Sequence, residues 1–90
     1  LHYSPGIPLR MNVKKPNKGE AFVLIKKRKI NSKNYFFLSK NNNLIKAARN
    51  LYPLIRKIKN KGYKKIAVEK IPNIGIGQTI NDRLERASKY

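Results

Sequence analysis

Few side chains in this sequence are of the types that carry out acid–base or nucleophilic chemistry. His2 is the only histidine, and the acidic residues are Glu20, Glu69, Asp82 and Glu85. Cysteine is absent, which removes disulfides, thiolate metal sites and a cysteine nucleophile. No spacing among these residues matches a zinc site, a catalytic carboxylate pair or a nucleophile with its base. The sequence therefore predicts no catalytic residues, metal or cofactor of its own for these ninety residues.

A glycine-containing stretch near the C-terminus offers a different kind of site, one for an anion. Gly75 and Gly77 precede Thr79, which has the type and place of a helix N-cap, and Arg83 follows one turn later. Free N–H groups at a helix start attract phosphate, so these four residues form a candidate anion or nucleotide loop. The pattern is incomplete, because Ile80 stands where the dinucleotide fingerprint has its third glycine. We therefore favour a tight turn that packs a helix, with Arg83 in a surface ion pair or reaching solvent.

The longest helix is expected over Leu44–Asn60, because the apolar residues in this range keep the helical period. The asparagines at 41–43 are candidate N-caps, and Gly62 has the place of the residue that follows a C-cap. Pro53 removes one backbone hydrogen bond inside this helix, but it falls on the side opposite the apolar face. We therefore expect one kinked helix rather than two separate helices.

The glycine stretch leads into a second expected helix, Thr79–Tyr90. Its apolar positions fall on one face at spacings of four and three, and they are Ile80, Leu84 and Ala87. The opposite side carries two acid-to-base pairs, each four residues apart and in the favourable order. This helix is thus expected to bury one face and to leave the other in solvent.

Three apolar runs predict buried strands, and they are Phe22–Ile25, Tyr35–Leu38 and Ile66–Val68. The long helix lies between the second run and the third, which predicts a βαβ unit with these two strands parallel and a right-handed crossover. A further short strand is expected at Leu9–Val13. The connection from Val13 to Ala21 is too short for a helical crossover, so we expect this strand to run antiparallel to Phe22–Ile25.

Together these elements predict a small Rossmann-like α/β domain of two or three layers. Its sheet would be mixed but mostly parallel, with three to four strands, and two main helices would cover it. Residues 1–8 contain Pro5, Gly6 and Pro8, a composition that favours an extended tether or flap, and residues 9–90 would form the domain. Because the chain begins at Leu1, we expect it to be a part of a longer protein.

The formal net charge of +18 favours a polyanionic partner such as RNA, DNA or an anionic membrane surface. However, the lysines are scattered, few aromatic residues are interleaved with them, and Lys, Asn and Ile all have AT-rich codons. We therefore favour base composition as the source of the charge. The longest unbroken apolar run, Ala21–Ile25, is too short to span a membrane.

Three segments resemble motifs of one family in the family's order. The run from Gly75 to Ala87, Gly-x-Gly-x-x-Ile-x-Asp-Arg-Leu-x-Arg-Ala, resembles the closing motif of the C-terminal domain of two-domain threonylcarbamoyl-AMP synthases. Ala47–Tyr52, followed by Leu-Ile-Arg at 54–56, resembles the helix signature of that domain. His2–Pro5, followed by Pro-Leu at 8–9, resembles the linker between the two domains. Pro53 departs from the family pattern. The region before Phe22 is also shorter than in the family, so we expect an early helix to be missing and one sheet face to be left to a partner domain.

The resemblance implies an accessory domain in tRNA threonylcarbamoyladenosine biosynthesis. Its partner would be an N-terminal, YrdC-like catalytic domain that uses ATP, threonine, bicarbonate and Mg²⁺ in the cytoplasm. The resemblance also implies that His2, Tyr3 and Pro5 help to cover that domain's active site, so that this chain gates it. We expect the linker to be disordered without the catalytic domain, and the chain to be inactive alone. The sequence does not decide whether the chain contacts tRNA or which ligand the linker senses.

The sequence also allows two alternatives from other functional classes. One is a stand-alone basic RNA-binding module, which the net charge supports. The other is a small nucleotide-binding regulator that uses the loop Gly75–Gly77. A salt titration against tRNA tests the first, and amide shifts on addition of ATP test the second.

Overall fold

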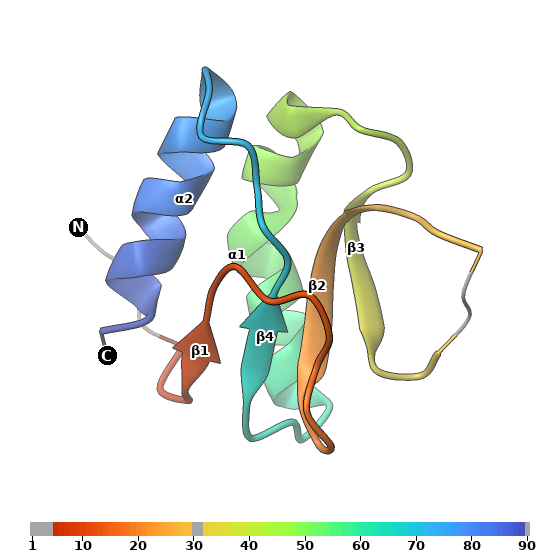
Figure 1. The fold of residues 1–90 in the computed structure, drawn as a ribbon. Helices are drawn as coiled ribbons and strands as arrows, with labels where there is room; N and C mark the ends of the chain where they lie inside the picture. The colour runs from red at the N-terminus through yellow and green to blue at the C-terminus, as the bar shows by residue number, and fades with distance from the viewer. Residues whose placement is uncertain (1–4, 30–31, 90) are drawn as a thin grey trace.

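The computed structural model describes residues 5–29 and 32–89 (Figure 1). Its elements, in chain order, are β1 (Leu9–Arg10), β2 (Ala21–Lys26), β3 (Tyr35–Ser39), α1 (Leu44–Asn60), β4 (Ile66–Val68) and α2 (Ile76–Ala87). The strands form one four-stranded sheet of order β1-β4-β2-β3, and every neighbouring pair is parallel. The predicted α/β class is confirmed, and α1 and β4 have the predicted bounds.

The position of β1 differs from the prediction. Leu9 and Arg10 pair in parallel with Ile66 and Ala67 of β4, instead of running antiparallel to β2, so the sheet is wholly parallel rather than mixed. The prediction was wrong because this connection needs no helix. β1 is only two residues long, and residues 11–20 return across β4 on the face away from α1 (Figure 1). An extended chain covers about 3.3 Å per residue, so these residues suffice for the return.

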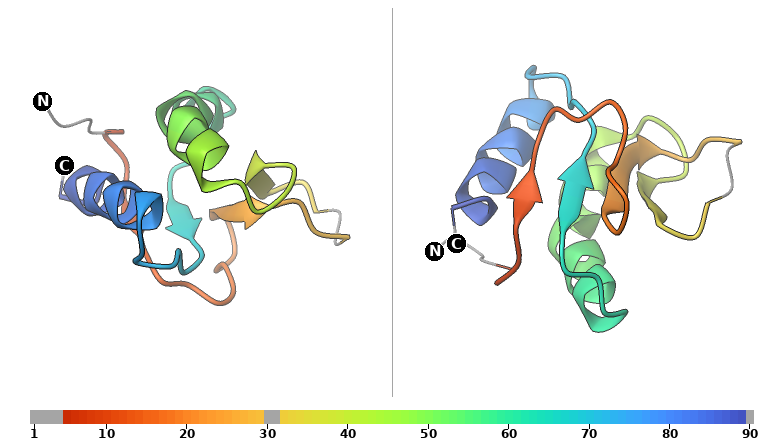
Figure 2. Two further views of the ribbon diagram at one scale, coloured as in Figure 1. Left: turned by 90° about the horizontal axis from the view of Figure 1, so that it is seen from above. Right: turned by 60° about the horizontal axis from the view of Figure 1, so that its bottom comes forward.

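Both helices lie on the same face of the sheet and run opposite to the strands (Figures 1 and 2). α1 crosses this face between β3 at one edge and β4, in the right-handed sense that parallel connections favour. α2 lies beside α1 at the β1 end of the sheet, and the two helices are in contact. Among the described residues, neither helix is long and apolar enough to cross a membrane.

The main core lies between the helices and the sheet. Four α1 side chains are at most 1% exposed, and they are Ala47, Leu51, Ile55 and Ile58. They pack with Ala21, Val23 and Ile25 on one face of β2, and with Ile80, Leu84 and Ala87 of α2. The predicted buried face of α2 is thereby confirmed. α1 continues through Pro53, which is exposed, so a single helix is confirmed, and the kink stays a prediction.

The opposite face of the sheet has a smaller apolar cluster and no helix among the described residues. Phe22, Leu24 and Ala67 are at most 2% exposed there, and Val13 of the returning segment packs on them. The Val13 N–H donates to the Val68 carbonyl at 3.0 Å, which fixes the segment against β4. The fold is therefore two-layered, with residues 11–20 as an irregular cover over part of the second face.

An ion pair between Arg10 and Glu20 joins the two ends of this covering segment. The Arg10 guanidinium donates two hydrogen bonds to the Glu20 carboxylate, both at 2.7 Å, and the Asn17 N–H donates a third at 2.6 Å. Glu20 is 3% exposed. The hydrogen bonds from Arg10 lower the pKa of Glu20, against the opposing effect of its burial, and the Asn17 N–H lowers it further. Because β4 lies between β1 and β2 in the sheet, the pair of Arg10 and Glu20 joins β1 to the start of β2 across β4.

Glu20→Gln is expected to lower the free energy of unfolding at pH 7 by about 2 kcal/mol, because a charged partner is removed from a buried hydrogen-bond set. The folded-state pKa of Glu20 lies below the ordinary value of 4.5. Its stabilisation is thus fully present above pH 4.5 and is lost as the pH falls through the lowered pKa. Urea unfolding across this acidic range measures both effects. Glu85→Gln, in an exposed pair at 3.8 Å, is the control and should change little.

Candidate functional site

The stretch between β4 and α2, which includes the predicted anion loop, lies at the carboxyl ends of the strands. Glu69 begins it. Its N–H donates to the Val23 carbonyl, and its carboxylate accepts from the Ile25 N–H at 2.7 Å and from Arg28 at 2.5 Å. Glu69 therefore serves to tie this end of β4 to β2. Open α/β sheets usually bind ligands at the carboxyl ends of their strands. The geometry of the loop therefore decides whether it is an anion site or only a tight turn.

The two glycines of the loop serve different purposes. Gly75 has φ 56° and ψ −128°, a conformation that side chains with a Cβ avoid. Gly77 has no positive φ, but a Cβ on it would lie 1.9 Å from the Pro72 carbonyl oxygen. The loop backbone thus packs directly on the first turn of α2. Asn81 holds the same loop from the next turn, because its amide donates to the Ile71 carbonyl at 2.9 Å.

The start of α2 differs from the prediction. α2 begins at Ile76, and its N-cap is Gly75, which offers no side-chain cap. Thr79 is therefore inside the helix and exposed, instead of capping it. The N-cap preference of threonine did not decide the boundary, because the tight contact at Gly77 fixes the preceding turn. The helix or cap preference of one side chain contributes less free energy than such a packing contact.

The helix start has fewer free N–H groups than an anion site would use. The Gly77 N–H donates to the Ile74 carbonyl at 3.0 Å, and the Gln78 N–H donates to the Gly75 carbonyl at 3.1 Å. Arg83 lies against α1 instead, with its guanidinium carbon 6.0 Å from the centre of the Tyr52 ring. The geometry therefore supports the tight-turn interpretation. Anion binding by Gly75, Gly77, Thr79 and Arg83 stays a prediction.

An apolar hollow of about 640 Å³ lies beside this loop. The described large hydrophobic residues that are more than a third exposed all line it: Ile45 at 58%, Ile74 at 77% and Ile76 at 38%. Asn41, Asn42 and Asn43 complete the lining with the first residues of α1. The sequence reasoning missed this patch, because Ile45 is far from the other two isoleucines along the chain.

The predicted linker is only partly within the described residues. His2 and Tyr3 lie outside them. Pro5 is less than 2% exposed, and the Pro8 carbonyl accepts a hydrogen bond from the Ile66 N–H at 2.9 Å. The expected disorder is therefore wrong for residues 5–8, because burial of Pro5 and bonding to β4 hold this segment on the domain. The segment enters the sheet directly as β1.

The carboxylates offer no catalytic arrangement in the described part of the chain. Glu20, Glu69, Asp82 and Glu85 each form an ion pair with an arginine or lysine. No group of three or more His, Asp or Glu side chains that could hold a metal occurs in residues 5–29 and 32–89. The pairs of α2 are the two that were predicted from their spacing. The acidic residues that the structure describes thus have structural partners.

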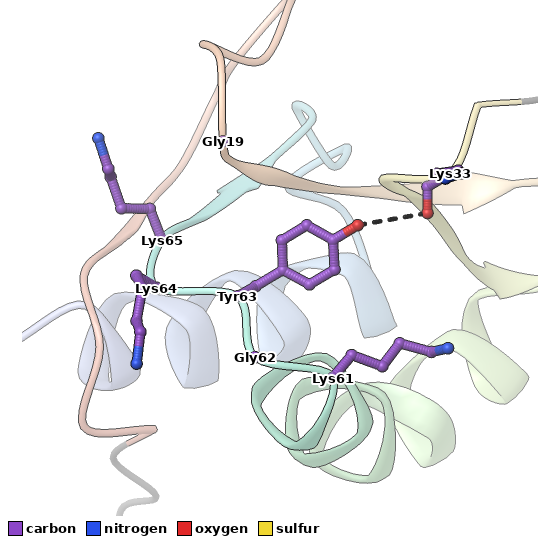
Figure 3. A pocket seen from close by; sticks show the side chains of 7 residues that line it. All are labelled: Gly19, Lys33, Lys61, Gly62, Tyr63, Lys64 and Lys65. Atoms are coloured by element: carbon purple, nitrogen blue, oxygen red, sulfur yellow. Dashed lines mark hydrogen bonds between the residues drawn. The ribbon is translucent and has the colours of Figure 1, made fainter.

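A second hollow, of about 630 Å³, lies at the other end of the strands, where α1 ends (Figure 3). Its lining is basic and contains one aromatic ring: Gly19, Lys33, Lys61, Gly62, Tyr63, Lys64 and Lys65. The sequence reasoning missed this hollow too. The run Lys-Gly-Tyr-Lys-Lys at 61–65 is the available signal, but along the sequence it indicates only the end of a helix.

Comparison with known proteins gives two matches. The sequence profile of a family described as "Threonylcarbamoyl-AMP synthase, C-terminal domain" matches residues 1–89. The structure is similar to the crystal structure of P. abyssi Sua5 complexed with L-threonine, with a TM-score of 0.72 and 22% sequence identity over 99% of this chain. This chain spans 30% of the length of that protein. No curated protein matches the sequence.

Proposed function

The chain belongs to the family of threonylcarbamoyl-AMP synthase C-terminal domains, and we propose that it is the accessory domain of an L-threonylcarbamoyladenylate synthase, which holds the interdomain linker over the active site and gates it. In this proposal the reaction takes place in an upstream YrdC-like catalytic domain, which binds ATP, Mg²⁺ and threonine in the cytoplasm. The P. abyssi protein was crystallised with L-threonine, which is consistent with that substrate. This chain contributes position and no catalytic group.

One observation carries the proposal, namely that the end of the linker is fixed to the domain. Pro5 is buried, Ile7 packs against the main core, and Pro8 is hydrogen-bonded to β4. His2 and Tyr3 are therefore only a few residues from a rigid anchor. A short tether between an anchor and a cleft restricts where the tether can lie, which is what covering an active site needs.

Lengthening the tether tests this role. Insertion of Gly-Ser-Gly-Ser between Ser4 and Pro5 in the two-domain protein leaves the anchor intact but releases His2 and Tyr3 from a fixed distance. We expect the rate of threonylcarbamoyl-adenylate formation to fall by about tenfold, as expected when positioning is lost. Pyrophosphate release in the presence of ATP, threonine and bicarbonate measures this rate.

The same insertion between Asn41 and Asn42, which are exposed, is the matched control and should leave the rate unchanged. An equal rate for the tether variant and the unmodified protein would refute the positioning role. Pyrophosphate release by the ninety residues alone would refute the assignment of all chemistry to the upstream domain.

A further inference from the structure

We propose that the hollow around Tyr63 binds a single-stranded nucleic acid. A base would stack on the Tyr63 ring, and the lysines that line the hollow would contact the phosphates on either side: Lys33, Lys61, Lys64 and Lys65. This inference goes beyond the accessory role and does not depend on it. The hollow lies at the amino ends of the strands, whereas the predicted anion loop lies at their carboxyl ends.

The charges around the hollow are all of one sign. The four lysines are exposed, none of them is in an ion pair with a described residue, and no acidic residue lines the hollow. Lys65 acts electrostatically on Glu20, but that carboxylate is already bound by Arg10 at two positions. The lysines are therefore free to neutralise phosphates, which is the main source of affinity for nucleic acids.

The position of these lysines is not explained by the end of α1 alone. Cations favour a helix C-terminus, but the last turn of α1 already contains Lys57 and Lys59. Lys61 is the C-cap of α1, whereas Lys33 precedes β3, and Lys64 and Lys65 precede β4, so three of the lining lysines lie outside both α1 and its cap. The fold brings them together around one hollow.

Tyr63 is a fixed aromatic platform. Its ring meets Phe36 edge to face, with centroids 5.6 Å apart and an interplanar angle of 87°. Its hydroxyl donates a long hydrogen bond of 3.4 Å to the Lys33 carbonyl. The ring is nevertheless partly exposed, and Figure 3 shows it broadside between Lys64 and Lys65 on one side and Lys33 and Lys61 on the other. A ring held in this way loses little freedom when a base stacks on it.

The hollow has room for a nucleotide unit. Its volume of about 630 Å³ is within the range of small-molecule sites. Gly19 and Gly62 form part of its lining, and beyond the adjacent backbone no heavy atom lies within 4 Å of the place where a Cβ on either would be. Stacking on Tyr63 requires a base that is not paired within a duplex, which favours a single strand over a double helix.

The test measures binding of fluorescent oligouridine and oligothymidine strands of about eight nucleotides by anisotropy at several salt concentrations. Four phosphate contacts predict that log K falls with log salt with a slope of about −2.8. The variant Lys33→Gln, Lys61→Gln, Lys64→Gln, Lys65→Gln should lose most of this slope and bind at least about thirtyfold more weakly at low salt. The tighter of the two strands identifies the preferred sugar.

A control variant removes the same amount of charge elsewhere: Lys14→Gln, Lys15→Gln, Lys46→Gln, Lys70→Gln. None of these exposed lysines lines the hollow, so the slope should change by less than about one unit. Tyr63→Leu should weaken binding by about tenfold, whereas Tyr63→Phe keeps the ring and should bind normally. Circular dichroism and thermal unfolding verify that each variant is folded.

Equal losses in the two quadruple variants would overturn the proposal, because binding would then follow net charge and not this hollow. Duplex RNA that binds as tightly as the single strand would also overturn it, as would a folded Tyr63→Leu variant with normal affinity. None of these outcomes bears on the tether experiment, since pyrophosphate release does not depend on strand binding.

Discussion

Replacing Gly77 by alanine is expected to lower the free energy of unfolding by about 3 kcal/mol, the upper end of the usual cost of overpacking. The sign is opposite to that of the same change in an ordinary helix interior, where alanine is more stable than glycine by roughly 1 kcal/mol. The reason is the Pro72 carbonyl oxygen, which would lie 1.9 Å from the new Cβ. Backbone on both sides of the contact must shift, because no flexible side chain is available to move away.

Two neighbouring substitutions separate this contact from other effects. Gly75→Ala introduces a Cβ into open space at φ 56° and ψ −128°, so it tests conformational strain alone and should cost about 1 to 3 kcal/mol. Gln78→Ala changes an exposed residue of α2 and should be neutral within about 0.5 kcal/mol. Urea unfolding of the three variants measures the differences. A Gly77→Ala variant at least as stable as the unmodified domain would show that the loop does not pack on α2 in this way.

The parts of the fold that were predicted correctly have signals that repeat along the chain. α1 has an apolar face over its whole length, so its bounds did not depend on any single residue. Pro53 did not interrupt that prediction, because it falls on the exposed side. The strand Ile66–Val68 was equally clear, since a continuous apolar run ends shortly before a proline. In both cases local preference and burial indicate the same structure.

The features that were missed depend on contacts between distant segments. β1 has two residues, too few to show which strand it pairs with, and its partner β4 lies more than fifty residues later. The start of α2 is set by the contact between Gly77 and Pro72, which outweighs the N-cap preference of Thr79. Residues 1–8 have the composition of a flexible tether, yet Pro5 is buried.

The candidate sites show the same limit. The hollow around Tyr63 combines the end of α1 with Lys33 and Gly19, so no single stretch of sequence contains its pattern. The isoleucine-lined hollow likewise combines the start of α1 with the loop before α2. Composition predicted that the chain is strongly basic, but it did not predict where the charge would be concentrated. Position in the fold is needed for that step.

Leu84→Ala is expected to lower the free energy of unfolding by about 3 kcal/mol, because burial rather than surface charge holds α2 in place. Leu84 is 1% exposed and packs in the core shared with α1. The ion pairs of α2 have side chains that are 57–72% exposed, so each contributes little. A loss of this size is a large part of the stability of a small domain, typically 5–15 kcal/mol.

The matched comparison is Leu54→Ala, the same change at a partly buried leucine of α1, which should cost about 1 kcal/mol. Hydrogen exchange locates the effect: in Leu84→Ala the amides of α2 should lose more protection than those of β2, because α2 is the last element of the chain and lies at the β1 end of the sheet. Equal costs for the two leucines, or uniform loss of protection, would mean that α2 is held by contacts other than its apolar face. The first turn, where Gly77 meets Pro72, would then be the remaining attachment, and the Gly77→Ala variant would show the selective loss of α2 protection instead.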